Sequence, residues 1–147
     1  MNADDPPRYY TVAEANAMVG RLRDLFGLVI QLRGQLGALY QRLDAAGHPP
    51  RDEDMEEDAE QSSDGAALPP DVIRDQAWFR GLVETLREKL EEVQACGCVI
   101  KDVEAGLVDW LARHDGRDVY LCWKLGEPSV AYYHDLDAGF AGRRPLP

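Results

Sequence analysis

The C-terminal third of the chain carries the side chains whose types and spacing could do chemistry. Asp109, Cys122 and His134 offer a carboxylate, a thiol and an imidazole, and all three groups bind zinc in proteins. A cysteine activated by a histidine can also act as a nucleophile. The same residues equally fit a half-polar sheet face, because a cysteine in mid-strand is often a small buried apolar residue. Glu127 is a further catalytic candidate, unless it only makes its Gly-Glu-Pro turn soluble.

Two further polar groups lie close to the C-terminal end. His134, Asp135 and Asp137 are candidate ligands of a divalent metal ion, which is the cofactor that these residues suggest. The candidate anion-binding residues are Arg143, Arg144 and Lys124, since paired cations can hold a phosphate or a carboxylate. Salt bridges to acidic residues of the body are the alternative role for the arginines.

Alternating apolar residues predict that these groups stand on a small antiparallel sheet of about three strands. Asp115-Gly116 suits a type I′ hairpin, and Gly126-Glu127-Pro128 suits a three-residue connection. Both registers give one apolar core face: Val108, Trp110, Ala112, Val119, Leu121, Trp123, Leu125, Ala131 and Tyr133. The opposite face has three predicted rows: Asp109, Cys122, Tyr132; Leu111, Tyr120, His134; and Leu107, Lys124, Val130. Cys122 should therefore lie within reach of Asp109 and His134.

A long helix is expected before the sheet, over residues 11–46. Thr11 and Glu14 form a capping box, and Gly47 ends the helix. Between them, apolar residues recur at spacings of three and four, as in the seam of a coiled coil: Ala15, Met18, Leu22, Leu25, Val29, Leu32, Leu36, Leu39 and Leu43. A second helix over residues 71–96 repeats the pattern with Phe79, Val83, Leu86, Leu90 and Val93, and Gly97 closes it. The two helices should pack as an antiparallel hairpin.

A second pattern on the first helix has two interpretations. Ala13, Gly20, Gly27 and Gly34 recur every seven residues, away from the apolar seam. Each mid-helix glycine costs about 1 kcal/mol relative to alanine. The glycines either lie on a solvated face or form a groove where another backbone approaches closely.

The charge of the chain is unevenly distributed. The net charge is −11, of which −7 comes from residues 51–64, where Arg51 faces eight acidic residues, so that −4 remains elsewhere. Residues 47–70 are therefore expected to be an acidic, mobile linker. Nothing in the composition offers the basic surface that nucleic-acid binding needs, and no apolar run is long enough to span a membrane. With no export signal, we expect a cytoplasmic protein with reduced cysteines.

Several stretches resemble a known family. "YTVAEAN", "GCVIKDVEAGLVDW", "GRDVYLCWKLGEP" and "YYHDLDAGFAGRRPL" are similar to the bacterial family of uncharacterised proteins known as domain of unknown function 2203. The resemblance implies helices first and a sheet-rich end, and it brings no mechanism. The matching positions are Glu14, Asn16, Lys101, Asp102, Gly106, Leu107, Asp109, Cys122, Trp123, Gly126, Glu127, His134, Gly139 and Arg143.

The sequence thus predicts one α+β domain over residues 1–147, with a sheet region and tail in residues 99–147. One hairpin cannot cover its whole seam, so a homodimer is expected. No phosphate-binding loop, dinucleotide turn or zinc-protease helix signature is present. Our first hypothesis is a non-enzymatic, homodimeric interaction or scaffold module. The second is a small metal-assisted hydrolase or ligand-binding enzyme with a site around Glu127, His134, Asp135 and Asp137.

Overall fold

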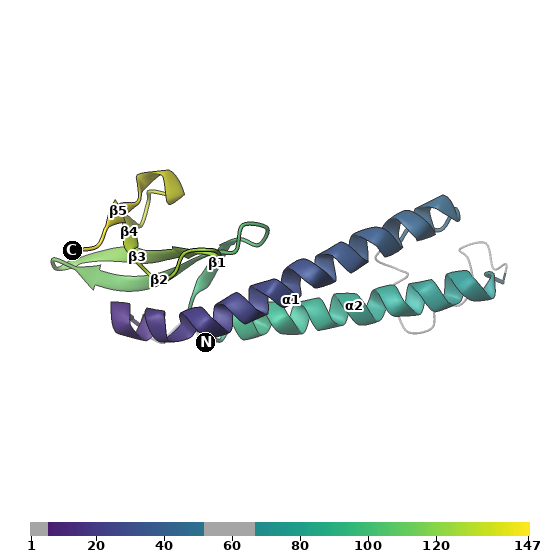
Figure 1. Ribbon diagram of the computed structural model, residues 1–147, viewed down its shortest axis with the longest axis horizontal. Helices are drawn as coiled ribbons and strands as arrows, with labels where there is room; N and C mark the ends of the chain where they lie inside the picture. The colour runs from purple at the N-terminus through teal and green to yellow at the C-terminus, as the bar shows by residue number, and fades with distance from the viewer. Residues whose placement is uncertain (1–5, 52–66) are drawn as a thin grey trace. The chain divides into compact units, whose positions relative to one another are not determined.

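The computed structural model describes residues 6–51 and 67–147 and confirms the α+β class, with two helices before an antiparallel sheet (Figure 1). The helices are α1 (Val12–Ala45) and α2 (Pro70–Gln94). The five strands follow in the order β1-β2-β3-β4-β5: β1 (Val99–Asp102), β2 (Leu107–His114), β3 (Arg117–Lys124), β4 (Tyr132–Asp135) and β5 (Arg144–Pro145). A short 3-10 helix, η2 (Phe140–Gly142), lies between the last two. No helix in the described ranges is long and apolar enough to cross a membrane.

The chain divides into two compact units. The sheet unit combines residues 1–27 with residues 91–147, and the hairpin unit comprises residues 28–90. The sheet unit therefore contains the first turns of α1, the last turn of α2 and all five strands. The two stretches that build it lie far apart in the sequence.

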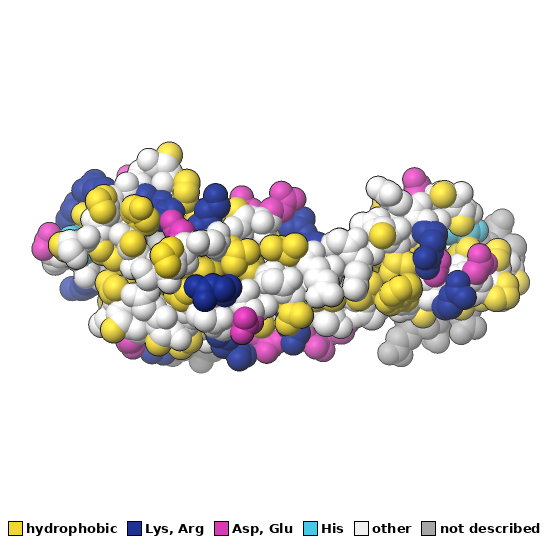
Figure 2. Space-filling view, in the orientation of Figure 1, with side chains coloured by type: hydrophobic (Ala, Val, Ile, Leu, Met, Phe, Trp, Pro, Cys, Tyr) yellow, Lys and Arg dark blue, Asp and Glu magenta, His cyan; other side chains and the backbone are white. Residues whose placement is uncertain are grey.

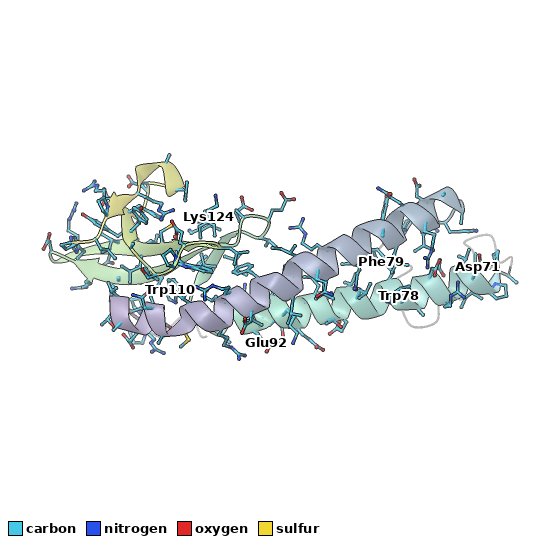
Figure 3. The ribbon with its side chains drawn as sticks, in the orientation of Figure 1. Asp71, Trp78, Phe79, Glu92, Trp110 and Lys124 are labelled. Atoms are coloured by element: carbon cyan, nitrogen blue, oxygen red, sulfur yellow. The ribbon has the colours of Figure 1, made fainter. Side chains whose placement is uncertain are left out.

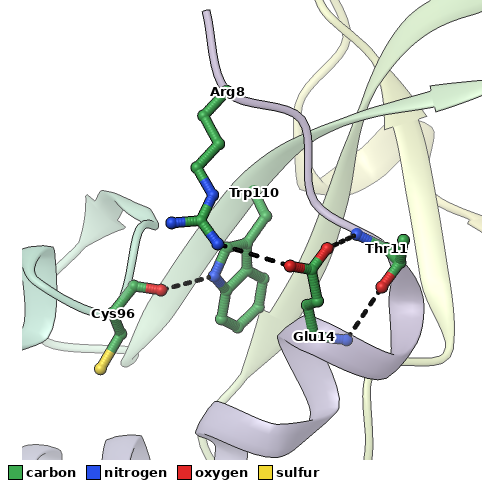
Figure 4. A network of polar contacts seen from close by, with 5 residues as sticks. All are labelled: Arg8, Thr11, Glu14, Cys96 and Trp110. Carbon is green, nitrogen blue, oxygen red and sulfur yellow. Dashed lines mark hydrogen bonds and ion pairs between the residues drawn. The ribbon is translucent and has the colours of Figure 1, made fainter.

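The predicted capping box starts α1 (Figure 4). The Glu14 amide donates to the Thr11 hydroxyl at 3.1 Å, and the Thr11 amide donates to the Glu14 carboxylate at 2.9 Å. These bonds use two amides that the helix itself leaves unpaired. They hold the pKa of Glu14 below its usual value, with a further contribution from Arg8. The helix start is thus fixed where it meets the sheet.

One apolar face of the sheet packs on the first turns of α1 to form the core of the sheet unit. Ala15, Leu22 and Phe26 are fully buried there, together with Val93 at the end of α2. From the sheet come Val108, Trp110, Ala112, Val119, Leu121, Trp123 and Tyr133, as the predicted registers require. The buried Trp110 indole donates to the backbone carbonyl of Cys96 at 3.1 Å. The N-terminal half of the seam therefore packs on strands.

The predicted hairpin between β2 and β3 has its predicted turn. Asp115 and Gly116 both have positive φ angles, 54° and 77°, as a type I′ turn requires. Arg113 pairs with Asp118 and Trp110 with Leu121, while on the next strand Leu121 pairs with Tyr133. Because a slip of one residue would turn every side chain to the other face, this agreement fixes both faces of the sheet.

The sheet has five strands, more than the predicted number of about three, and the two strands that the prediction missed lie at the edges of the sheet. Strands β1 and β5 have four and two residues, which is too short for an alternating pattern to be recognised. Before β4, Val130 is buried in the core and Ala131 is exposed, the reverse of the prediction. The Asn16 side chain accepts a hydrogen bond of 2.7 Å from the Val130 amide, which holds this segment outside the ladder.

The hairpin unit has a smaller core. Leu43, Leu68 and Val72 are buried together, with Ile73 and Phe79 packed against them. Leu68 was expected in the mobile linker, but here its apolar side chain completes this core. Residues 52–66 of the predicted linker lie outside the described residues. Arg42 forms two hydrogen bonds, of 2.8 and 2.5 Å, with the buried carboxylate of Asp75.

Candidate functional site

The three central strands bring a carboxylate, a thiol and an imidazole together on the sheet face opposite the helices. Asp109 lies on β2 directly across from Cys122 on β3, and His134 on β4 pairs with Tyr120, two residues along β3 from Cys122 and on the same face. The three ligand atoms lie within 4.8 Å of one another. Their residues are 1%, 0% and 2% exposed. The predicted proximity of Cys122 to both partners is therefore confirmed, and the cluster is fully buried.

Hydrogen bonds fix the imidazole of His134. Its Nδ1 lies 2.8 Å from the backbone carbonyl of Asp135, and its Nε2 lies 2.9 Å from Oδ2 of Asp109. Because a carbonyl can only accept, Nδ1 carries a proton. The contact between Nε2 of His134 and Oδ2 of Asp109 then needs a second proton, which the imidazole and the carboxylate share. The other carboxylate oxygen, Oδ1 of Asp109, is buried and has no hydrogen-bond partner.

The thiol of Cys122 is protonated in this environment. Burial, together with the neighbouring Asp109 carboxylate, raises its pKa to about 12. A thiolate is the reactive form of cysteine, so a thiol with this pKa is a poor nucleophile near pH 7. The arrangement thus gives little support to the hypothesis of a cysteine nucleophile activated by His134.

Lys101 covers one side of the cluster. Its ammonium group lies 4.0 Å from Oδ2 of Asp109 and 4.6 Å from the ring centre of Tyr120. The Tyr120 ring in turn lies 5.7 Å from the imidazole of His134. Sequence reasoning gave Lys101 no place in the site because β1, which carries it, was not recognised as a strand.

Arg143 lies next to Tyr132, the residue of β4 that pairs with Cys122. Its guanidinium lies 3.9 Å from the ring centre of Tyr132 and 4.5 Å from that of Phe140. It forms a 2.5 Å ion pair with Glu127, and its side chain is 8% exposed with Nε unpartnered. Glu127 also accepts the Lys124 amide at 2.8 Å, while its backbone carbonyl accepts the Trp123 indole at 3.0 Å. Glu127 and Arg143 therefore tie the turn to the C-terminal tail.

The remaining candidate residues stand apart from the cluster. The Asp135 carboxylate pairs with Arg144 at 3.1 Å and with Arg117 at 3.8 Å, while Asp137 is exposed. Lys124 lies over the Phe140 ring at 5.3 Å and is labelled in Figure 3. In the part of the chain that the structure describes, Asp109, Cys122 and His134 form the one group of metal-binding type. The structure thus brings together Asp109, Cys122 and His134, but not Asp135 and Asp137.

Fold and site together define a small α+β protein whose sheet holds a buried aspartate, histidine and thiol cluster. The chain belongs to the family described as Uncharacterized conserved protein (DUF2203), whose family model matches residues 8–146. No curated protein and no solved structure matches the chain.

Proposed function

We propose that this chain is a non-enzymatic interaction module that works as a homodimer, joined through its hairpin unit. The observation that carries the proposal is the incomplete burial of apolar side chains on α1 and α2. Leu32 and Leu36 of the α1 seam are only partly buried. The apolar residues Val83, Leu86 and Leu90 of the α2 seam are also only partly buried. Two helices alone cannot enclose such a seam, whereas four helices can.

Apolar side chains also lie on the surface of this unit (Figure 2). Leu28, Ile30, Tyr40 and Trp78 are between 44% and 50% exposed. Trp78 and Phe79 are labelled on α2 in Figure 3. Large exposed apolar side chains favour a protein contact, because burying them removes apolar surface from water.

A buried amide lies on α2, within the spacing of the seam. Gln76 is 6% exposed, and its Oε1 atom has no hydrogen-bond partner. Gln76 follows Val72 by four residues and precedes Phe79 by three, which is the spacing of the apolar seam. Single polar residues at such positions set the register and number of helices in coiled coils.

The helices of this unit carry little net charge. Although the chain carries a net charge of −11, residues 70–90 hold four acidic and four basic side chains. Residues 28–45 hold two arginines and one aspartate. Two copies that meet through these helices would therefore avoid strong like-charge repulsion there, although residues 51–64 of the same unit carry a charge of −7.

The hydrolase hypothesis has less support. It needs Glu127, His134, Asp135 and Asp137 at one accessible centre. Glu127 and Asp135 are engaged in ion pairs with arginines, and His134 is bonded to Asp109 away from solvent. These contacts favour a structural role for each of the three residues.

The experiment is the mass of the full chain by light scattering at several concentrations. We expect about twice the 16.4 kDa of one chain. Because Leu28 and Trp78 are exposed within one chain, the double variant Leu28→Glu/Trp78→Glu should fold and run with the mass of one chain. Leu136→Glu is the matched control, since Leu136 is 47% exposed but lies in the sheet unit. A wild-type protein with the mass of one chain at every concentration would refute the dimer.

A further inference from the structure

We propose that Asp109, Cys122 and His134 bind one divalent transition-metal ion of the zinc class, and that this ion joins β2, β3 and β4. The inference is independent of the proposed dimer, because all three residues lie in the sheet unit. The site would be a structural one. Each ligand comes from a different strand, so a single ion would connect the three central strands of the sheet.

The donor atoms select the type of ion. One sulfur, one nitrogen and one carboxylate oxygen lie within 4.8 Å of one another. Zinc accepts this mixture at bond lengths of about 2.0–2.3 Å, which in tetrahedral geometry leaves donors roughly 3.5 Å apart. Magnesium and calcium ions prefer oxygen ligands alone. Only small side-chain movements separate the observed arrangement from a zinc site.

His134 already has the orientation of a metal ligand. A histidine that binds a metal usually donates its other ring N–H to a carbonyl or carboxylate, which fixes the ring. The Nδ1 atom of His134 donates to the backbone carbonyl of Asp135 at 2.8 Å. Its Nε2 atom is therefore directed at Asp109 and is the atom that would bind the ion.

The unpartnered oxygen of Asp109 is the second observation that indicates a ligand. Asp109 is 1% exposed, yet Oδ1 receives no hydrogen bond. A buried, unpaired carboxylate oxygen is costly and rare in folded proteins. An ion bound by both carboxylate oxygens would satisfy Oδ1 and obtain four donor atoms from three residues.

Charge balance permits the exchange of protons for an ion. Without metal, Asp109 and His134 share one proton beyond that on Nδ1, and Cys122 holds its own, so the buried cluster is neutral. A divalent ion would displace both protons and be bound by a carboxylate, a thiolate and a neutral imidazole. The cluster would again be neutral, and two protons would leave to water.

The surroundings argue for a slowly exchanging, non-catalytic ion. The three ligands are at most 2% exposed, Lys101 lies 4.0 Å from Asp109, and Arg143 lies over the ring of Tyr132, which pairs with Cys122. Catalytic zinc sites keep an open position for water or substrate, whereas structural sites are closed. Lys101, whose side chain is 39% exposed, can move away from Asp109 as the ion takes over its charge.

The test begins with elemental analysis of the full, untagged chain. We expect close to one transition-metal ion per chain. Cobalt(II) added to chelator-treated protein should give the charge-transfer absorption of a cobalt–thiolate bond. Cys122→Ser should abolish that band, and Asp109→Asn, which keeps the shape of the side chain, should weaken cobalt binding by more than the 10- to 100-fold seen for outer-shell changes.

Cys98→Ser provides the matched control. Cys98 is another buried thiol of the sheet unit, and its sulfur donates to the carbonyl of Val93 instead of facing the cluster. This variant should keep both the metal and the band. The proposal is overturned if the wild-type chain contains no stoichiometric metal and gives no thiolate band with cobalt. It is equally overturned if Cys122→Ser, shown to be folded by circular dichroism, keeps its metal.

Discussion

At the scale of single residues, the clearest electrostatic feature is a buried carboxylate held by one arginine. Asp75 is 6% exposed and receives both hydrogen bonds of the Arg42 guanidinium. These bonds are the main cause of the lowered pKa of Asp75, and burial opposes them. Without its arginine, the carboxylate would be a buried and unpaired charge apart from Arg74, whose Nε lies 3.8 Å away.

This pair should govern the acid stability of the hairpin unit. Because the folded pKa of Asp75 lies below its unfolded value of about 3.9, the stabilisation is complete above that value and is lost as the pH falls through the folded pKa. Arg42→Ala should raise the pKa of Asp75 and move the acid unfolding midpoint to higher pH, as followed by circular dichroism. In an Asp75→Asn background, the same substitution should leave the midpoint in place. A shift of equal size in that background would show that Asp75 is not responsible.

At the scale of elements, the structure narrows the meaning of the glycine stripe on α1. A Cβ atom added at Gly20, Gly27 or Gly34 would meet nothing within 4 Å. Among the described residues, therefore, no backbone approaches these three glycines, and the solvated-face interpretation is the one that the geometry supports. Gly97 is different, because its φ is 87° and a Cβ there would collide with the ring of Tyr10.

Gly34→Ala should accordingly stabilise the protein by about 1 kcal/mol, which is the difference in helix propensity. Gly97→Ala should destabilise it through backbone strain and the collision with Tyr10. Urea unfolding of both variants measures the two changes. If Gly34→Ala instead lowered the mass seen by light scattering, a second copy would have to approach the helix at the stripe.

The sequence predicted the elements with strong periodicity and missed those without it. The seam of α1, the capping box and the registers around Trp110 and Leu121 all follow from repeated spacings. Strands β1 and β5 depend on their neighbours rather than on a pattern of their own. The inversion at Val130 depends on one hydrogen bond that its amide donates to Asn16, more than 100 residues earlier. Such long-range contacts leave no local signal.

The same reasoning applies to the site. Asp109, Cys122 and His134 were brought together correctly because they lie on strands with a readable register. Asp135 and Asp137 were grouped with His134 because they are neighbours in sequence, but alternation along β4 directs the Asp135 carboxylate to Arg144 and Arg117. Lys101 could have been found only by recognising that Val99 pairs with Asp109.

At the scale of the whole molecule, all three cysteines lie in the sheet unit. Cys96, Cys98 and Cys122 are buried and free. Burial raises the pKa of Cys98 and of Cys122 to about 12, and it also raises that of Cys96. The reactivity of these thiols therefore measures whether the sheet unit is folded around them.

We expect native protein to react slowly with a thiol reagent near pH 7, because little thiolate forms at these pKa values and the sulfurs are not accessible. As denaturant is added, the three thiols should become reactive together, at the rate at which the sheet unit opens. The reaction rate is compared with that of fully denatured protein, in which all three thiols react at once. Fast labelling of a single cysteine in native protein would show that its surroundings open locally.

The discontinuity of the sheet unit has a consequence for synthesis on the ribosome. Residues 28–90 form the hairpin unit, and they are complete before most of the sheet has been made. Residues 1–27 need the strands that follow residue 91 to cover Leu22 and Phe26. The first turns of α1 must therefore wait for strands made later, with an apolar helix face uncovered meanwhile. A chaperone that binds emerging apolar segments would meet this protein at its N-terminal turns, and stalled chains ending before β2 should remain bound to it.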